Sequence, residues 1–251
     1  MGKSLGEACM TVTRCTRPFF SVVIPVLDEA AGIDAVVDHV RVVSYGEDVE
    51  IIVVDGDPSG STLAALTRTG VTGLTASTGR ARQQNAGAAA AAGSNILFLH
   101  ADTRLPAGAL RAAGAALDAG AALGAFSLAI RSPGLWLRLV AAGATLRSRL
   151  LSLPYGDQAF FLRREIFCAL GGFPDVPLME DVALARTVRR AGGRVRVLPQ
   201  HVVTSARRYE AEGALGATAR NLALLALYGL GVSPARLARF YPARSGRGGG
   251  A

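Results

Sequence analysis

The chain has 251 residues, of which 50% are hydrophobic and 18% charged, a composition that excludes a disordered or fibrous protein. A chain of this length buries enough surface to fold as one large domain without disulfides or a structural metal. Its three cysteines, Cys9, Cys15 and Cys168, contain no C-x-x-C pair, which argues against a disulfide framework or a zinc site and favours a reducing cytosol.

The formal net charge is +8, and because Lys3 is the only lysine, arginine carries nearly all of the positive charge. Arginine favours bidentate contacts with phosphate. Nucleic acid, an anionic membrane face, a phosphorylated substrate and a bias in genomic composition would each account for the excess. Aromatic residues make up only 6% of the chain and no nucleic-acid motif occurs in it, so we expect no nucleic-acid partner.

Strand and helix patterns alternate along the chain. In chain order, we predict a strand over residues 19–26, a helix over 33–43, a strand over 49–54, a helix over 62–69, a strand over 71–76, a helix over 79–93, a strand over 95–99 and a helix over 106–117. Ser59 or Ser61 is expected to cap the second helix, and Pro106 to lie in the first turn of the fourth. This alternation predicts an α/β fold with a mostly parallel, doubly wound sheet.

Beyond these elements the sequence predicts helices rather than strands. A helix is expected over residues 181–190, the sheet pattern ends after Val197, and further helices are expected over residues 213–231 and 234–241. We therefore expect four regions, namely a flexible N-terminus (1–18), an α/β domain (19–208), C-terminal helices (209–242) and a disordered tail (243–251). Residues 1–18 lack the apolar segment of a signal peptide, which predicts a cytoplasmic protein.

Acidic residues follow three of the predicted strands. Asp28 and Glu29 come after the first, Asp55 after the second and Asp102 after the fourth. Parallel sheets bind ligands beyond the carboxyl ends of their strands, where carboxylates can hold a divalent cation that neutralises a diphosphate. Asp102 is the best candidate for the metal ligand, with His100 as a second ligand or a hydrogen-bond partner. Taken singly, such acids are more often turn and cap formers.

Two arginines open the predicted helix over residues 79–93. Arg80 and Arg82 combine guanidinium charge with a helix N-terminus, which favours phosphate. Later in the chain, Arg207 and Arg208 are adjacent, and one of them is predicted to reach a diphosphate and compensate the charge of a leaving group. A solvated basic surface is the alternative explanation for both pairs.

Six short segments, in their order along the chain, resemble the successive motifs of family 2 glycosyltransferases with the GT-A fold. The first three read SVVIPVLDE at residues 21–29, IIVVDG at 51–56 and LFLHADT at 97–103. The other three, GDQ at 156–158, GGFP at 171–174 and MEDVAL at 179–184, resemble the acceptor-side and catalytic segments. The resemblance extends from about residue 19 to residue 208. Within the family, HADT at 100–103 and TSARR at 204–208 are similar to the branch associated with arsenosugar biosynthesis.

The resemblance implies a role for each matching residue. Nucleotide and donor contacts fall on Pro25, Asp28, Glu29 and Asp55. Asp102 belongs to the D-x-D element that holds Mg²⁺ or Mn²⁺ on the diphosphate, and here His100 replaces its first acid.

Asp181 is implied to be the general base that takes the proton of the acceptor hydroxyl, and Glu180 to orient it, while Asp157 and Gln158 face the acceptor or the donor sugar. Two adjacent carboxylates can separate their pKa values, leaving one suited to act as base. Without the resemblance, the Glu180–Asp181 pair would read as acids that compensate a helix dipole.

The implied reaction is metal-assisted transfer of a sugar, with inversion, from a donor linked to UDP or GDP to an acceptor hydroxyl of a lipid or a small molecule. A nucleotidyltransferase is an alternative, but no Gly-rich loop follows the first strand to cradle a triphosphate. The other alternative is a non-catalytic protein that binds nucleotide sugars, and it stays open because His100 replaces the first acid of the D-x-D element.

Two apolar segments carry flanking arginines. The predicted helix over residues 213–231 lies near Arg207, Arg208, Arg236 and Arg239, and residues 135–137 lie near Arg138, Arg147 and Arg149. Most amphipathic helices pack on a domain, but such segments also lie in anionic membrane surfaces. The sequence thus leaves open a peripheral location on the inner face of the membrane.

Overall fold

Strands and helices alternate in the computed structural model, which describes residues 20–241 apart from the side chain of Arg208. The expectations for residues 1–18 and 243–251 lie outside the described residues, as does Phe19. The division between a domain ending at residue 208 and the C-terminal helices stays a prediction.

Within the described part of the chain, eight strands form one sheet in the order β3-β2-β1-β4-β7-β6-β8-β5. The strands are β1 (Phe20–Val26), β2 (Val49–Asp55), β3 (Thr72–Thr75), β4 (Asn95–Phe98), β5 (Thr103–Arg104), β6 (Leu123–Arg131), β7 (Phe161–Arg163) and β8 (Val195–Ser205). Neighbours are parallel in β3-β2-β1-β4 and in β6-β8, whereas β7 runs antiparallel to β4 and β6, and β5 to β8. The predicted α/β fold with a mostly parallel sheet is confirmed.

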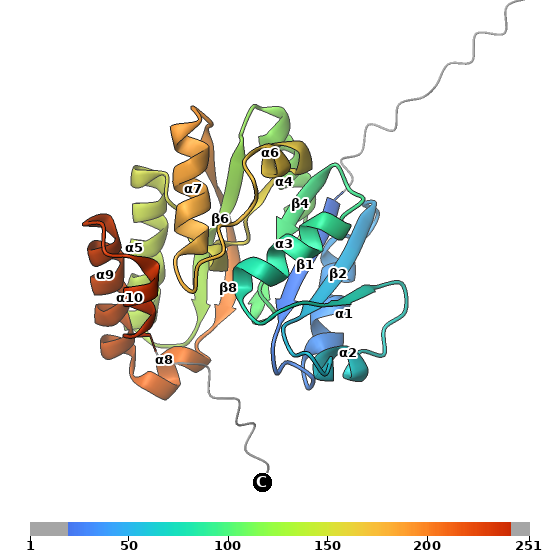
Figure 1. Ribbon diagram of the computed structural model, residues 1–251, viewed down its shortest axis with the longest axis horizontal. Helices are drawn as coiled ribbons and strands as arrows, with labels where there is room; N and C mark the ends of the chain where they lie inside the picture. Colours follow the sequence, from blue (N-terminus) through green and yellow to red (C-terminus); the bar gives the residue numbers. More distant parts are fainter. Residues whose placement is uncertain (1–19, 242–251) are drawn as a thin grey trace, which may run out of the picture.

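Helices cover both faces of this sheet (Figure 1). They are α1 (Ile33–Val43), α2 (Ser61–Ala65), α3 (Arg80–Ala90), α4 (Ala109–Asp118), α5 (Leu135–Leu151), α6 (Arg164–Ala169), α7 (Glu180–Arg190), α8 (Arg207–Glu212), α9 (Ala214–Gly229) and α10 (Pro234–Ala238), with a 3₁₀ turn, η1, over Gly156–Gln158. Helices α1, α4 and α5 pack on one face, and α3, α6 and α7 on the other. Of the helices described, none is both long and apolar enough to cross a membrane.

The continuous apolar run of β1 arises from burial on both faces. Val22 and Ile24 belong to the core under α1 and α4, whereas Val23 belongs to the core under α3 and α7, and all three are fully buried. Strands buried in this way lose the alternation of polar and apolar residues and read as uninterrupted hydrophobic segments. The first, second and fourth predicted strands follow this rule.

The prediction that the sheet ends after Val197 is wrong, because β8 continues to Ser205. Leu198 pairs with Phe126, but the next pair along the ladder is His201 with Ser127. Residues 199 and 200 are therefore extra residues in β8, a bulge that interrupts the alternation by which a strand is recognised. The Ser127 hydroxyl donates to the Leu198 carbonyl at 2.7 Å and fixes the shift in register.

A buried carboxylate, rather than Ser59 or Ser61, holds the start of α2. Asp55 is fully buried; one of its oxygens accepts the Asp57 N–H at 2.9 Å, and the other accepts the N–H of Thr62 at 2.8 Å and of Leu63 at 3.3 Å. The Ser59 hydroxyl donates instead to Asp57.

Helix α4 begins later than predicted. Its first residue is Ala109, after Gly108 in the left-handed conformation, so Pro106 precedes the helix and does not lie in its first turn.

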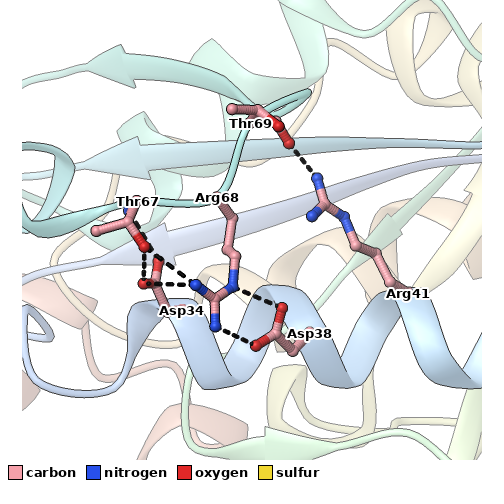
Figure 2. Close-up of polar contacts among 6 residues, drawn as sticks. All are labelled: Asp34, Asp38, Arg41, Thr67, Arg68 and Thr69. Atoms are coloured by element: carbon pink, nitrogen blue, oxygen red, sulfur yellow. Dashed lines mark hydrogen bonds and ion pairs between the residues drawn. The ribbon is translucent and has the colours of Figure 1, made fainter.

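Helix α2 ends at Ala65, four residues earlier than predicted, because the following segment is tied to α1 (Figure 2). Asp34 accepts hydrogen bonds from the backbone and the hydroxyl of Thr67. Arg68 donates to both oxygens of Asp38, at 2.8 and 2.7 Å, and Arg41 donates to the Thr69 carbonyl. An extended segment exposes its backbone groups to these partners, which a helix would not.

The strand order reverses between β1 and β4, because β1 pairs with β2 on one side and with β4 on the other. Their pairing ends at Val23 and Phe98, so the residues that follow separate beyond this edge of the sheet. Ligands of open α/β sheets bind in such a crevice, at the carboxyl ends of the strands. Pro25 to Glu29 and His100 to Asp102 occupy its two sides.

Helix α3 approaches the sheet closely at Gly87. A Cβ atom there would lie 2.3 Å from Val23 Cγ1 and 3.0 Å from Val54 Cγ2. We expect Gly87→Ala to lower the free energy of unfolding by about 1–3 kcal/mol through overpacking. Chemical denaturation measures the change. The matched control is Gly143→Ala on α5, where a Cβ meets nothing within 4 Å; it should stabilise the protein by roughly 0.5–1 kcal/mol. Equal stability of the two variants would contradict the close approach.

Candidate active site

Six of the fourteen predicted site residues meet in a cavity of about 170 Å³ beyond the crevice between β1 and β4. This central cavity is lined by the ionisable side chains Arg80, His100, Asp102, Asp157, Glu180 and Asp181. They come from the start of α3, the loop after β4, η1 and the first turn of α7. Segments separated by a hundred residues thus place four carboxyl groups around one small volume.

Asp181 is held at the wall of the central cavity by backbone donors. Its Oδ2 accepts the N–H of Gly156 at 2.6 Å and its Oδ1 accepts the N–H of Val182 at 2.7 Å. Gly156 leaves little room, since a Cβ there would lie 3.3 Å from both Asp181 Oδ2 and His100 Nε2. These contacts fix the carboxylate in one orientation.

Glu180 is 3% exposed and pairs with Arg80, whose Nη1 lies 3.2 Å from Glu180 Oε1. Burial raises the pKa of Glu180; the Arg80 guanidinium opposes this effect and the neighbouring Asp181 adds to it. The pair joins the start of α3 to the start of α7 across the cavity. Arg80 therefore balances acidic charge at this point and reaches the cavity from the side of the crevice.

Asp157 completes the acidic wall. Its Oδ1 is buried and, within the described residues, has no hydrogen-bond partner. Burial raises the pKa of Asp157 to about 6, and the negative charges of Asp181 and Asp102 contribute in the same direction. The cavity thus gathers four carboxyl groups around one lining arginine, Arg80, which is the electrostatic condition for binding a cation or a hydroxyl donor.

Asp102 lies where three cavities join. Besides the central cavity it lines a β1-side cavity, with Pro25, Glu29 and Gln83, and a basic cavity, with Asp28, Arg104, Arg131 and Arg207. The backbone carbonyl of Asp102 accepts the Ser205 N–H at 3.1 Å, which ties this loop to the end of β8. The position of Asp102 lets one ligand group contact it from any of the three cavities.

The residues present fit a divalent cation that takes most of its ligands from a bound diphosphate and from water. Within the described residues no group of three or more His, Cys, Asp and Glu side chains is arranged to hold a metal by itself. Mg²⁺ characteristically takes one or two carboxylates and completes its shell with phosphate oxygens and water. Asp102 at the junction and the unpartnered Oδ1 of Asp157 supply such a partial set of oxygen ligands.

The β1-side cavity contains Pro25 and Glu29, as predicted for nucleotide contacts, together with Arg80 and His100. Gln83, which the sequence interpretation did not single out, closes its floor by donating to the carbonyls of Val26 at 2.6 Å and Val54 at 2.9 Å. These bonds bridge the ends of β1 and β2. The signal in the sequence that could have identified Gln83 is its position one helical turn after Arg80.

The basic cavity contains Asp28, with a positive φ of 56°, and Arg207, whose Nη2 lies 3.8 Å from Glu29 Oε2. Burial lowers the pKa of Arg104, and the charge of Arg131 adds to this effect. Arg207 thus stands close to the predicted diphosphate site. The side chain of Arg208 lies outside the described part of the structure.

Three predicted site residues line none of these cavities. Asp55 is fully buried beneath the loop that it caps, and Arg82 forms an exposed ion pair with Asp175 at 2.9 Å. Gln158 is fully buried, donates to the Phe126 carbonyl at 2.8 Å and accepts from Ser148 and the Tyr155 N–H. The polar groups of Gln158 are engaged inside the protein, and Arg82 pairs at the surface. A contact of Arg82 with phosphate and of Gln158 with a sugar stays a prediction.

Several cavity residues escaped the sequence interpretation. Tyr155 precedes the GDQ segment directly, and the guanidinium carbon of Arg147 lies 3.6 Å from its ring centroid. Tyr209, Asn221 and Tyr241 enter from α8, α9 and the end of the described chain. Only the packing of the C-terminal helices brings these three to the cavity, and no local motif marks them.

Comparisons with known proteins concern the family and the fold. The model of the family described as "Glycosyl transferase family 2" matches residues 21–172, which is more than half of the chain. No match was found among curated proteins.

Solved structures share the fold at low identity. S. aureus TarS 1-349 matches with a TM-score of 0.57 and 16% identity over 74% of this chain and 60% of its own, and TarS 1-349 in complex with UDP-GlcNAc matches at the same score and identity over 58% of its own. The mannosyltransferase PcManGT from Pyrobaculum calidifontis, in complex with GDP-Man and Mn²⁺, matches with a TM-score of 0.57 and 24% identity over 75% of this chain and 57% of its own. Each match thus spans well under two thirds of the relative.

Gln158→Leu separates a structural role of this residue from a contact with the donor. The substitution leaves the Tyr155 N–H and the Phe126 carbonyl without partners in a buried site, so the free energy of unfolding should fall by about 1–3 kcal/mol. The free energy of donor binding, measured by titration calorimetry with UDP- and GDP-sugars, should change less than the free energy of unfolding does. Unchanged stability with lost affinity would return Gln158 to the binding surface.

Proposed function

Because the chain belongs to glycosyl transferase family 2, we propose that it transfers a sugar from a nucleotide-sugar donor with inversion, with Asp181 as base and a divalent cation at the diphosphate. The observation that carries the proposal is the fixed carboxylate of Asp181, which faces the same cavity as Asp102 and Asp157. The cavity therefore offers one end to an acceptor hydroxyl and the other to a donor diphosphate.

The donor is proposed to lie across the crevice between β1 and β4. Pro25 and Glu29 lie along the nucleotide side, and Arg80 and Arg207 flank the diphosphate, where they compensate the charge that develops on the leaving group. Asp102 and Asp157 would hold Mg²⁺ or Mn²⁺, and such an ion when bound neutralises the diphosphate as a Lewis acid. The solved structures with UDP-GlcNAc and GDP-Man support a UDP- or GDP-linked donor.

The acceptor step needs a base, because an alcohol is a poor nucleophile at neutral pH. Asp181 takes the proton of the acceptor hydroxyl as its oxygen bonds to the anomeric carbon. The bond from that carbon to the diphosphate oxygen breaks on the opposite face, and its electron pair leaves with the nucleoside diphosphate. Glu180 holds Arg80 in place and lies beside Asp181 in the same helical turn. The configuration of the sugar inverts.

The family match argues against a nucleotidyltransferase. The second alternative, a protein that binds nucleotide sugars without turnover, predicts donor binding with neither hydrolysis nor transfer. Membership of the arsenosugar branch rests only on the likeness of residues 100–103 and 204–208 to that branch. Acceptor and precise donor are best approached with a panel of UDP- and GDP-sugars, in which the released nucleoside diphosphate is measured.

Asp181→Asn tests the base. The amide keeps the size of the side chain but does not accept a proton, so turnover should fall by about 10²–10⁴-fold while donor affinity stays the same. The control is Asp175→Asn, which removes an exposed acid that pairs with Arg82 away from the cavities. Full activity of Asp181→Asn in the presence of an active wild type would reject this assignment.

Asp102→Asn tests the cation. In the wild type, Mn²⁺ should increase the affinity for a nucleotide sugar and a chelator should reverse the gain, as measured by titration calorimetry. The variant should show little dependence on Mn²⁺, because amide oxygen is a weaker ligand than carboxylate. Equal donor binding by the wild type with Mn²⁺ and with chelator would count against Asp102 as a metal ligand.

A further inference from the structure

The exposed apolar side chains of the described residues are concentrated on one part of the molecule. Apart from Val42 and Tyr45, all the large hydrophobic side chains that are strongly exposed belong to α5, to α9 and its last turn, or to the residues just after α10. Leu139 is 57% exposed, Leu150 73% and Leu222 59%. Figure 1 shows α5, α9 and α10 next to one another at one end of the sheet. Apolar patches of this kind mark sites of interaction with partners or membranes.

The same helices carry only positive charge. No Asp or Glu occurs in α5, α9 or α10, whereas arginines occur in all three, at positions 138, 147, 149, 220 and 236. Arg138, Arg149 and Arg236 are exposed. Arginine and leucine without acids are the composition of a surface that lies on an anionic bilayer. This complementarity distinguishes a lipid surface from a second copy of the chain, whose matching face would be equally basic.

An apolar cavity of about 370 Å³ opens between α5 and α9. Trp136, Leu139, Val140 and Leu222 line it, and Gly143 leaves room in its wall, since a Cβ there meets nothing within 4 Å. This apolar cavity and the central cavity share Tyr155, Asp157, Tyr209 and Asn221. An apolar passage therefore leads from the exposed leucines to the carboxylates of the active site.

We infer that the acceptor is a membrane lipid with a free hydroxyl, whose apolar part lies between α5 and α9 and whose hydroxyl reaches Asp181. This inference rests on the proposed function and names the acceptor class for that site. Asp157 and Asn221 stand at the polar end of the apolar cavity, where a head group needs hydrogen-bond partners. A small polar acceptor would gain nothing from the apolar lining, because its hydration would be lost there without compensation.

Arg147 lies between the apolar end and the polar end of the apolar cavity. Its guanidinium stacks on Tyr155 and donates to the Leu153 carbonyl at 3.1 Å, and these contacts hold a positive charge beside the passage. The lipid would contribute its hydroxyl oxygen to the new bond with the anomeric carbon and give its proton to Asp181. The nucleoside diphosphate would leave through the β1-side cavity, away from the bilayer.

Trp136, the single tryptophan of the chain, reports occupancy of the apolar cavity without any label. Dodecanol, farnesol and dioctanoylglycerol serve as probes with straight, isoprenoid and diacyl skeletons, and free glycerol as the polar control. At least one apolar alcohol should shift the emission of Trp136, whereas glycerol should not. Gly143→Phe, which fills the cavity, should weaken this binding at least about tenfold. Gly216→Phe on α9, where a Cβ also meets nothing within 4 Å, is the matched control and should bind as the wild type does.

A second arm identifies the source of the lipid. The wild type should float with vesicles of phosphatidylcholine that contain about one third phosphatidylglycerol and should not float with phosphatidylcholine alone. No binding of any apolar alcohol, or a dimer that buries α5 and α9 and ignores both vesicles, would overturn the inference.

Binding of UDP- and GDP-sugars is measured on the same samples, because it separates the two proposals. Gly143→Phe should keep donor affinity, since the filled cavity lies on the far side of Asp157 from the nucleotide. Donor binding without alcohol binding would refute the lipid acceptor alone. A wild type that binds no nucleotide sugar would refute the proposed function, whatever the alcohols do.

Discussion

The repulsion among carboxylates gathered at one edge of the sheet is the constraint on which the site depends. Asp102, Asp157, Glu180 and Asp181 line a single small cavity; burial raises the pKa of Asp157, and the charges of Asp181 and Asp102 raise it further. Folding tolerates this arrangement because Arg80 pairs with Glu180 and because backbone N–H groups hold Asp181. The remaining negative charge is directed at a substrate, which is how functional sites depart from the rule of fully paired buried charges.

The rest of the fold keeps these groups in place. Gly87 lets α3 lie close to the sheet, and this close packing sets the position of Arg80 on one side of the crevice. Asp55 closes the loop after β2, and Gln158 fixes the turn that carries Asp157 by bonding to Phe126, Ser148 and Tyr155. The hydrogen bonds of Asp55 and Gln158 explain why these polar side chains are retained in the core.

The sequence predicts much of the N-terminal half because local patterns determine it. Helix α1 spans the predicted residues, and the apolar runs of β1, β2 and β4 follow from burial on both faces. Long-range packing determines the remainder. The bulge in β8 hides a strand, and the internal hydrogen bonds of Asp55 and Gln158 cannot be read from the motifs that contain them. Tyr209, Asn221 and Tyr241 reach the cavity only because the C-terminal helices fold back over it.

The central claim is that the carboxylates at this edge hold a cation on the donor diphosphate. Its most direct test is a crystal structure with Mn²⁺ and a nucleoside diphosphate, in which anomalous scattering locates the metal. The account predicts one manganese peak bonded to an Asp102 carboxylate oxygen and to the diphosphate in the crevice between β1 and β4. A diphosphate held by arginines alone, or a manganese ion bound away from Asp102, would contradict it.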